Sequence, residues 1–220
     1  MNYLHWDQKT IDDFSDQNIE KLYSEGFVFT RLGRGVIQQT RSARINLEKF
    51  QPTSENRRIL KKVSDLTLEL SGLPLKEYDW NIGKLAKDFY DSKFGPGIMS
   101  AQKIKEMLTD AALSNFNTLF LYTHLGHVSR GYTICYKNPL LLHYSYPFYD
   151  LDTSPKDMGL GMMTMAIEYA KKAGMKYIYL GSLQRPADTY KLQFQGLEWF
   201  DGKNWQTDFE AVKGLLKTSR

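Results

Sequence analysis

The 220-residue sequence has almost no cysteine, since Cys135 is the only one. A single thiol can form neither an internal disulfide nor a cysteine-based zinc or iron–sulfur site. We therefore expect a protein of a reducing compartment. Because Cys135 stands in the middle of an apolar, strand-like run, it is predicted to be a buried structural thiol rather than a reactive one.

Long hydrophobic runs are also missing. No apolar stretch approaches the ~20 residues that a helix needs to cross a bilayer. The first residues do not show the charged, apolar and small-residue order of an export signal. These absences predict a cytoplasmic protein with no membrane partner, and the length suits one sizeable core with or without a smaller lobe.

Histidines are few, and only His124 and His127 stand close together. Gly126 between them predicts a turn, so the two rings would not share a helix face, and no third ligand is apparent. We expect no bound metal.

Basic residues are abundant, but only in one segment. Between Arg31 and Lys62 nine lysines and arginines stand against two acids, a local net charge of +7, whereas the whole chain carries +4. Such a segment can bind the phosphates of RNA, because neutralising phosphates releases counterions. The alternative is an ordinary solvated helix face. Arg57 and Arg58 favour binding, since at the start of a predicted helix they oppose its dipole, and a bound phosphate would relieve that cost.

The first half of the sequence is predicted to be mostly helical. We expect a short helix over 16–26, a hairpin around Gly33 and Gly35, and an amphipathic helix over 52–72 whose N-terminal half is basic. Two further helices are expected over 81–95 and 100–113, with a Gly-Pro-Gly turn between them. The composition changes near residue 115, and we expect a small basic N-terminal lobe, residues 1–72, ahead of a main domain, residues 73–220.

Strand patterns dominate from residue 117 onward. Three runs bounded by turn residues, 117–125, 127–137 and 140–150, predict an antiparallel meander. A helix from Met158 to Lys172 and a strand over 176–181 follow. A short helix, a terminal hairpin and a last helix are expected over 186–194, 196–206 and 209–217. The fold class is therefore α+β with a mixed sheet.

The helix that begins at Met158 is preceded by a basic residue and opened by glycines, in the spacing Lys156-x-x-Gly159-x-Gly161. A helix start offers unpaired N–H groups and a partial positive charge, and glycines allow an anion to approach closely. A tight turn without a ligand is the alternative. The order of meander, glycine loop, helix and strand resembles the acyltransferases of the GNAT superfamily, in which the loop holds the pyrophosphate of acyl-coenzyme A.

Two sequence blocks extend this resemblance over roughly residues 23 to 200. The downstream block has Tyr-Asp-x-Asp at 149–152, Ile-Glu-x-Ala at 167–170, Tyr-x-Tyr-Leu-Gly at 177–181 and Tyr-Lys at 190–191. The upstream block, RINLEKFQPTSENRR, matches an Arg, Phe-x-Pro-Ser, Arg-Arg signature through Arg44, Phe50, Pro52, Ser54, Arg57 and Arg58. In this order the blocks resemble the aminoacyl-tRNA–protein transferases, the arginyl and bacterial leucyl enzymes of the N-degron pathway.

The resemblance implies transfer of an aminoacyl group from aminoacyl-tRNA to an amine, with a protein N-terminus as the expected acceptor. An amine attacking an ester needs positioning, proton removal and support for the oxyanion, but no covalent nucleophile. The candidate catalytic residues are then Asp150, Tyr149 and Tyr190. The candidates for donor binding are Lys156, Gly159, Gly161, Tyr179 and Lys191. The candidates for tRNA binding are Arg41, Arg44, Arg57, Arg58 and Lys61. No cofactor is expected beyond aminoacyl-tRNA as co-substrate.

Structural roles compete with each of these assignments. Asp150 could satisfy backbone donors of a turn, Lys191 could be an ordinary surface lysine, and most strand tyrosines belong to the core. The family's N-terminal cysteines are also absent, since Thr40 stands where the last of them would align. Two other functions therefore remain open: an N-acyltransferase that uses acetyl-coenzyme A, and a non-catalytic member that binds tRNA.

Overall fold

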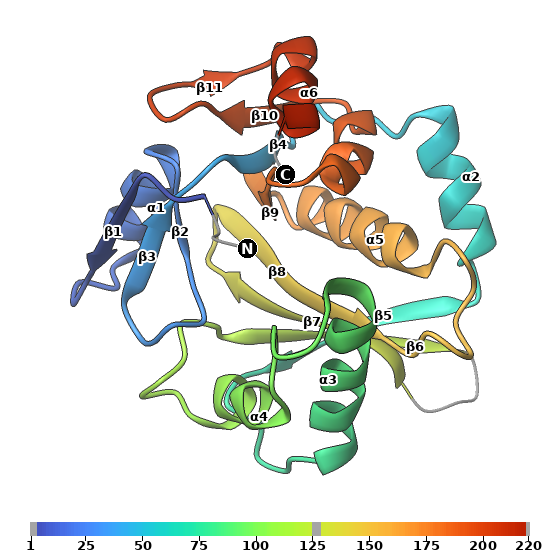
Figure 1. The fold of residues 1–220 in the computed structure, drawn as a ribbon. Helices are drawn as coiled ribbons and strands as arrows, with labels where there is room; N and C mark the ends of the chain where they lie inside the picture. Colours follow the sequence, from blue (N-terminus) through green and yellow to red (C-terminus); the bar gives the residue numbers. More distant parts are fainter. Residues whose placement is uncertain (1–3, 125–128, 219–220) are drawn as a thin grey trace.

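The protein is built on one mixed sheet of eight strands, and the computed structural model describes residues 4–124 and 129–218 (Figure 1). The strands lie in the order β11-β10-β4-β9-β8-β7-β6-β5. They are β4 (Ser42–Asn46), β5 (Leu66–Gly72), β6 (Thr118–His124), β7 (Ser129–Lys137), β8 (Leu141–Tyr149), β9 (Tyr177–Ser182), β10 (Leu197–Phe200) and β11 (Trp205–Gln206). A second sheet has three strands in the order β1-β3-β2: β1 (Asp7–Thr10), β2 (Phe27–Phe29) and β3 (Val36–Gln39).

Helices cover both faces of the large sheet. They are α1 (Asp16–Ser24), α2 (Ser54–Lys62), α3 (Trp80–Phe94), α4 (Ala101–Thr109), α5 (Met158–Lys172), the 3₁₀ helix η1 (Pro186–Gln193) and α6 (Phe209–Thr218). One core lies between the sheet and α2, α5 and α6. The other lies between the sheet and α1, α3, α4 and the three-stranded sheet. Figure 1 shows the three-stranded sheet with α1 on one side of the molecule and α2 on the other.

The predicted meander is confirmed. β6, β7 and β8 pair antiparallel in sequence order because turn residues separate runs of apolar and β-branched side chains. After β8 the chain forms α5 and returns as β9, which runs parallel to β8. This is the mixed α+β arrangement that the GNAT resemblance implies. The two parallel strands pair only from Leu141 to His143 and from Tyr177 to Tyr179, so their C-terminal halves separate.

The helix predicted over 52–72 is wrong beyond residue 62. α2 ends at Lys62, and β5 then pairs with β6 along seven residues, from Leu66 to Gly72. The leucines explain the error, because Leu66, Leu68 and Leu70 fit a strand's period of two while Leu66 and Leu70 also fit a helical spacing of four. Pairing with β6 decides between the two, and this pairing is non-local. The other helices, strands and hairpins that the sequence predicted are confirmed within a few residues, whereas β1 was not predicted.

The large sheet runs across the boundary expected at residue 72. β4 lies between β9 and β10, and β5 forms the edge beside β6, so residues 42–72 belong to the same sheet as the C-terminal half. Only β1, β2 and β3 form a sheet of their own. The change in composition near residue 115 therefore marks a change from helices to strands rather than a boundary between separate cores.

Candidate functional site

The strongest candidate site lies where β8 and β9 separate. The C-terminal end of β8 carries Tyr149, the following loop leads to Gly159 at the start of α5, and η1 follows the end of β9 with Tyr190 and Lys191. The separation follows from the loss of pairing after His143 and Tyr179. Because β8 and β9 are parallel, residues at their C-terminal ends meet at one edge of the sheet.

Tyr149 packs tightly against the glycine loop. It is half-buried, and burial raises its pKa, while the N–H of Gly159 lowers it in part. A side chain added at Gly159 would lie 3.2 Å from the Tyr149 hydroxyl. Gly159 thus allows the tyrosine to approach the helix start. The Gly159 N–H, which the sequence predicted to bind an anion, therefore faces the Tyr149 hydroxyl.

Tyr190 lies close to Tyr149. Tyr190 is 43% exposed. Burial of its hydroxyl is the main cause that raises its pKa, and the nearby Asp188 and Tyr149 raise it further. Two of the three predicted catalytic residues are thus brought together, although they stand far apart in the sequence. A phenol pair of this kind can exchange a proton with a bound amine or donate to an oxyanion.

Asp150 organises the turn that follows Tyr149. One carboxylate oxygen accepts the N–H groups of Asp152 and Thr153 at 2.9 and 3.2 Å, and the other accepts the Thr153 hydroxyl at 2.7 Å. The turn role set out as the alternative is therefore present. Participation of Asp150 in catalysis stays a prediction.

Lys191 is buried, and the surface position considered for it is wrong. Its ammonium donates to the Ser182 carbonyl at 2.8 Å and lies 4.0 Å from Asp188. Burial lowers its pKa, and Asp188 opposes that shift. In this arrangement Lys191 ties η1 to the end of β9. The observed contacts of Lys191 are those of a residue that positions η1, and its predicted contact with a donor phosphate stays a prediction.

Gly161 is a packing glycine. A side chain there would lie 2.6 Å from a methyl group of Val63, which follows α2. The missing side chain lets α2 and α5 pack closely, and the helix start near Gly161 is covered by protein. The predicted donor-binding role of Gly161 stays a prediction, beside the packing role that the structure gives it.

The positive charge at the start of α5 comes from neighbouring side chains. Lys62 of α2 forms an ion pair with Asp157. This contact lowers the pKa of Asp157 most, and Arg58 and Lys156 lower it further. Three cations from two segments thus surround the start of α5. The exposed Lys156 keeps its predicted position beside the loop.

Arg44 and Tyr179 lie in the core, on the sheet face opposite α5. The Arg44 guanidinium bonds Glu198 at 2.8 and 2.9 Å, lies between the rings of Tyr177 and Trp205, and donates to the Tyr179 hydroxyl at 3.3 Å. Strand alternation explains this placement, because Tyr177 and Tyr179 point to one face while Ile178 points to α5. Both side chains are buried and have structural partners here, and their predicted roles in tRNA and donor binding stay predictions.

The other predicted tRNA contacts are more accessible. Arg57, Arg58 and Lys61 are exposed on α2. Arg58 bonds Glu55, and Arg57 donates to the Pro52 carbonyl at 2.6 Å. Arg41 is half-buried and donates to the Leu183 carbonyl at 3.4 Å, just beyond β9, and burial lowers its pKa. These four positions remain predictions.

Sequence reasoning missed the aromatic residues of α3 that line one side of the site. The Phe89 ring lies 4.8 Å from the Tyr149 ring, and the Phe94 ring lies under the Arg185 guanidinium at 4.5 Å. The Tyr90 hydroxyl donates to the Pro147 carbonyl at 3.2 Å and holds α3 against β8. Nothing in the local pattern of α3 separates these contacts from ordinary core packing, so only the fold reveals them.

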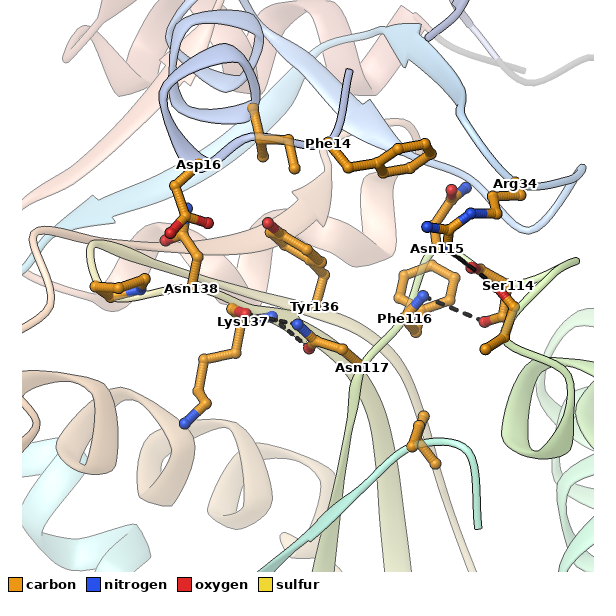
Figure 2. A pocket seen from close by; sticks show the side chains of 14 residues that line it. Phe14, Asp16, Arg34, Ser114, Asn115, Phe116, Asn117, Tyr136, Lys137 and Asn138 are labelled. Carbon is orange, nitrogen blue, oxygen red and sulfur yellow. Dashed lines mark hydrogen bonds between the residues drawn. The ribbon is translucent and has the colours of Figure 1, made fainter. Parts of the chain in front are cut away.

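A cavity of about 430 Å³ lies at the opposite end of β8 from this site. Asn115, Asn117 and Asn138 line it, together with Arg34 and Tyr136 (Figure 2). The asparagines bind the backbone of neighbouring loops: Asn115 accepts from Gly35 at 2.6 Å, Asn117 accepts from Lys137 at 2.9 Å and Asn138 accepts from Leu141 at 2.8 Å. This cavity is a junction between loops, and its polar groups serve the fold.

The cysteine prediction is confirmed, because Cys135 is fully buried and burial raises the pKa of its thiol. His124 bonds Asp65, and His127 lies outside the described residues. In the described part of the chain, no three His, Cys, Asp or Glu side chains group as metal ligands would. Over the same residues, no helix is both long and apolar enough to span a bilayer.

Known proteins of one kind are similar to this chain in sequence. No family model matches it. An aspartate/glutamate leucyltransferase of Cereibacter sphaeroides is 27% identical over 177 residues, which cover 75% of this chain and 61% of that protein. The protein of the same name from Ruegeria pomeroyi is 27% identical over 180 residues, covering 77% and 63%. The chain thus spans about three fifths of the length of the curated relatives it matches.

Solved structures are less similar. L-PGS from Bacillus licheniformis has a TM-score of 0.49 and 12% identity over 76% of this chain and 52% of that one. FemX has a TM-score of 0.45 and 11% identity over 76% of this chain and 60% of that one.

Proposed function

We propose that this protein is an aminoacyltransferase that moves an aminoacyl group from aminoacyl-tRNA to an amine. One structural observation carries the proposal: the basic helix α2 lies beside the loop that joins Tyr149 to α5. Lys62 and Arg58 act on Asp157 at the start of α5, and Tyr149 lies against Gly159, two residues further along the chain. A phosphate backbone bound along α2 would bring its end to the two tyrosines.

The sequence relatives support the same reaction, because they bear the name aspartate/glutamate leucyltransferase. We propose leucine as the first amino acid to test and peptides with N-terminal Asp or Glu as the first acceptors. The cations around the start of α5 suit an acidic acceptor. The proposed setting is the cytoplasm, where aminoacyl-tRNA is made.

In the proposed reaction the acceptor amine attacks the ester carbonyl of the aminoacyl-tRNA. The new amide bond forms as the ester C–O bond breaks, the tRNA 3′-terminal ribose hydroxyl leaves, and the amine proton passes to the leaving oxygen through the site. Tyr149 and Tyr190 are placed to relay that proton or to donate to the oxyanion. Lys191 holds η1, and with it Tyr190, at the end of β9.

Transfer assays with charged tRNA test the proposal. A tRNA pool charged with each labelled amino acid in turn is mixed with peptides of varied N-termini. We expect label to appear on peptide amines, and Tyr149→Phe and Tyr190→Phe each to reduce the rate by roughly 10²-fold. Tyr169→Phe is the matched control, because Tyr169 packs on Phe120 in the core and should keep full activity.

Three outcomes would contradict the proposal in different ways. Absence of transfer for every amino acid and acceptor would defeat it. Tight binding of acetyl-coenzyme A that is indifferent to tRNA, with acetylation of an amine, would instead identify an acyl-coenzyme A enzyme. Salt-dependent tRNA binding without any turnover would identify a non-catalytic tRNA-binding protein.

A further inference from the structure

Three exposed side chains of kinds that stack on nucleobases gather beside the tyrosine site. Phe94 ends α3 and is 40% exposed, Tyr190 of η1 is 43% exposed, and the Arg185 side chain is 40% exposed. The Arg185 guanidinium carbon lies 4.5 Å from the centre of the Phe94 ring. Two segments far apart in the sequence thus form one partly exposed cation–aromatic pair, with Tyr190 on the helix that follows Arg185.

This stacking patch, formed by Phe94, Arg185 and Tyr190, is next to the proposed reaction centre. The Phe89 ring lies 6.4 Å from the Phe94 ring and 4.8 Å from the Tyr149 ring, so one aromatic side chain separates the patch from Tyr149. Tyr190 and Tyr149 are close enough to interact electrostatically. A group bound on the patch would therefore lie beside Tyr190, which belongs to the patch, and one aromatic ring away from Tyr149.

The chemistry of the patch favours a nucleotide over an amino-acid side chain. A planar guanidinium on an aromatic ring presents a second flat face on which a base can stack, and its N–H groups suit the phosphate attached to that base. An aliphatic side chain such as leucine would gain nothing from the guanidinium. The Arg185–Asp188 contact, at 3.6 Å, orients the arginine on η1 and leaves its side chain partly exposed.

We propose that the stacking patch binds the terminal adenosine of the donor tRNA, with its base on Phe94 and Arg185 and its ribose toward Tyr190. The inference rests on the proposed function. It adds a site for the one nucleoside that carries the aminoacyl ester, and it assigns Phe94, which lies outside both sequence blocks, to donor binding. The ester then lies near Tyr149 because the ribose is held beside Tyr190.

Binding of two uncharged tRNAs tests the patch without relying on turnover. One tRNA has the complete CCA end and the other lacks only the terminal adenosine. We expect the unaltered protein to bind the complete tRNA about 10-fold more tightly, the size of one base stacked on an aromatic ring. Phe94→Ala should bind both tRNAs equally, and Phe94→Tyr should restore the preference.

Trp80→Ala is the matched control. Trp80 begins the same helix, is 66% exposed, and lies about 20 Å from Phe94 along a helix of this length. This variant should keep the 10-fold preference. Thermal unfolding of each variant shows that it is folded before its binding is compared.

Failures of the two proposals give different results. Equal binding of the two tRNAs by the unaltered protein, or an intact preference in Phe94→Ala, overturns the adenosine site and leaves the donor proposal in place. Binding of neither tRNA overturns the proposed function and this site together. Weaker binding by Phe94→Ala of leucylated tRNA alone would show that the patch contacts the amino acid, and the adenosine site would be wrong.

Discussion

Single residues of the same type have opposite roles in this protein. Arg44 is 7% exposed, paired with Glu198 and enclosed by aromatic rings, whereas Arg58 is exposed on α2 beside the start of α5. Both belong to the +7 segment and both fit the family signature. A charge count adds them together, but only the second is exposed.

The two arginines should therefore respond differently to mutation. Arg44→Leu leaves Glu198 buried without its main partner, and we expect a loss of about 3–5 kcal/mol in the free energy of unfolding, measured by urea denaturation. Arg58→Gln should leave stability nearly unchanged. It should weaken tRNA binding and reduce the slope of log affinity against log salt by about one. Unchanged stability in Arg44→Leu would contradict the core assignment.

His143 should make stability depend on pH. Its ring is buried and bonds the Tyr23 hydroxyl at 2.9 Å, and burial lowers its pKa to about 3. The unfolded chain, with a pKa near ~6.5, takes up the proton first as pH falls. The stabilising contribution is therefore present above about pH 6.5 and is lost as pH falls toward 3, by up to ~1.4 kcal/mol per pH unit.

Urea unfolding of the unaltered protein and of His143→Gln across pH 7 to 4 measures this effect. The difference between the two curves isolates the histidine from the carboxylates, which titrate in both proteins. We expect the unaltered protein to lose more stability than His143→Gln as pH falls. Parallel curves would show that His143 is not buried in its neutral form.

The arrangement at the start of α5 depends on how two helices pack together. α2 and α5 pack closely because Gly161 leaves room for Val63, and this packing brings Lys62 to Asp157. The two glycines of the sequence motif thus have different structural roles. Gly159 lets Tyr149 approach, and Gly161 lets a basic helix approach.

Gly161→Ala should disturb that packing. Its side chain would stand 2.6 Å from Val63, and we expect a loss of about 1–3 kcal/mol in the free energy of unfolding, partly restored in the double variant with Val63→Ala. Gly214→Ala in α6 is the control, because nothing lies within 4 Å of the added group. That change should stabilise the helix by up to about 1 kcal/mol. Equal effects of the two substitutions would contradict the packing role.

At the scale of the whole molecule, the large sheet joins residues from both of the parts that the sequence suggested. β4 is hydrogen-bonded between β9 and β10, and β5 protects the edge beside β6. Removing residues 1–72 would take away the strand that joins β9 to β10 and would expose the apolar face that α2 covers.

Expression of residues 73–220 alone tests this unity. We expect the fragment to lack a cooperative unfolding transition and to bind a hydrophobic dye, because it loses β4 and β5 from the large sheet and the three-stranded sheet, α1 and α2 from the two cores. The control adds residues 1–72 as a separate chain. Restored cooperative unfolding would show that the fragment lacked these contacts and had not simply misfolded. A fragment that unfolds cooperatively by itself would show that the boundary at residue 72 separates independent units.

The sequence by itself determined the order of elements and part of the site. Turn residues and hydrophobic periodicity are local, so the meander, α5 and β9 were predictable, and the resemblance of the two blocks singled out Tyr149, Tyr190 and Gly159. Tertiary structure decided the rest. Whether Arg44 or Lys191 faces water, whether 66–72 is helix or strand, and whether Phe94 reaches the site all depend on contacts between distant segments. A one-dimensional pattern holds a residue's chemistry but not its neighbours, and those neighbours set its burial and its role.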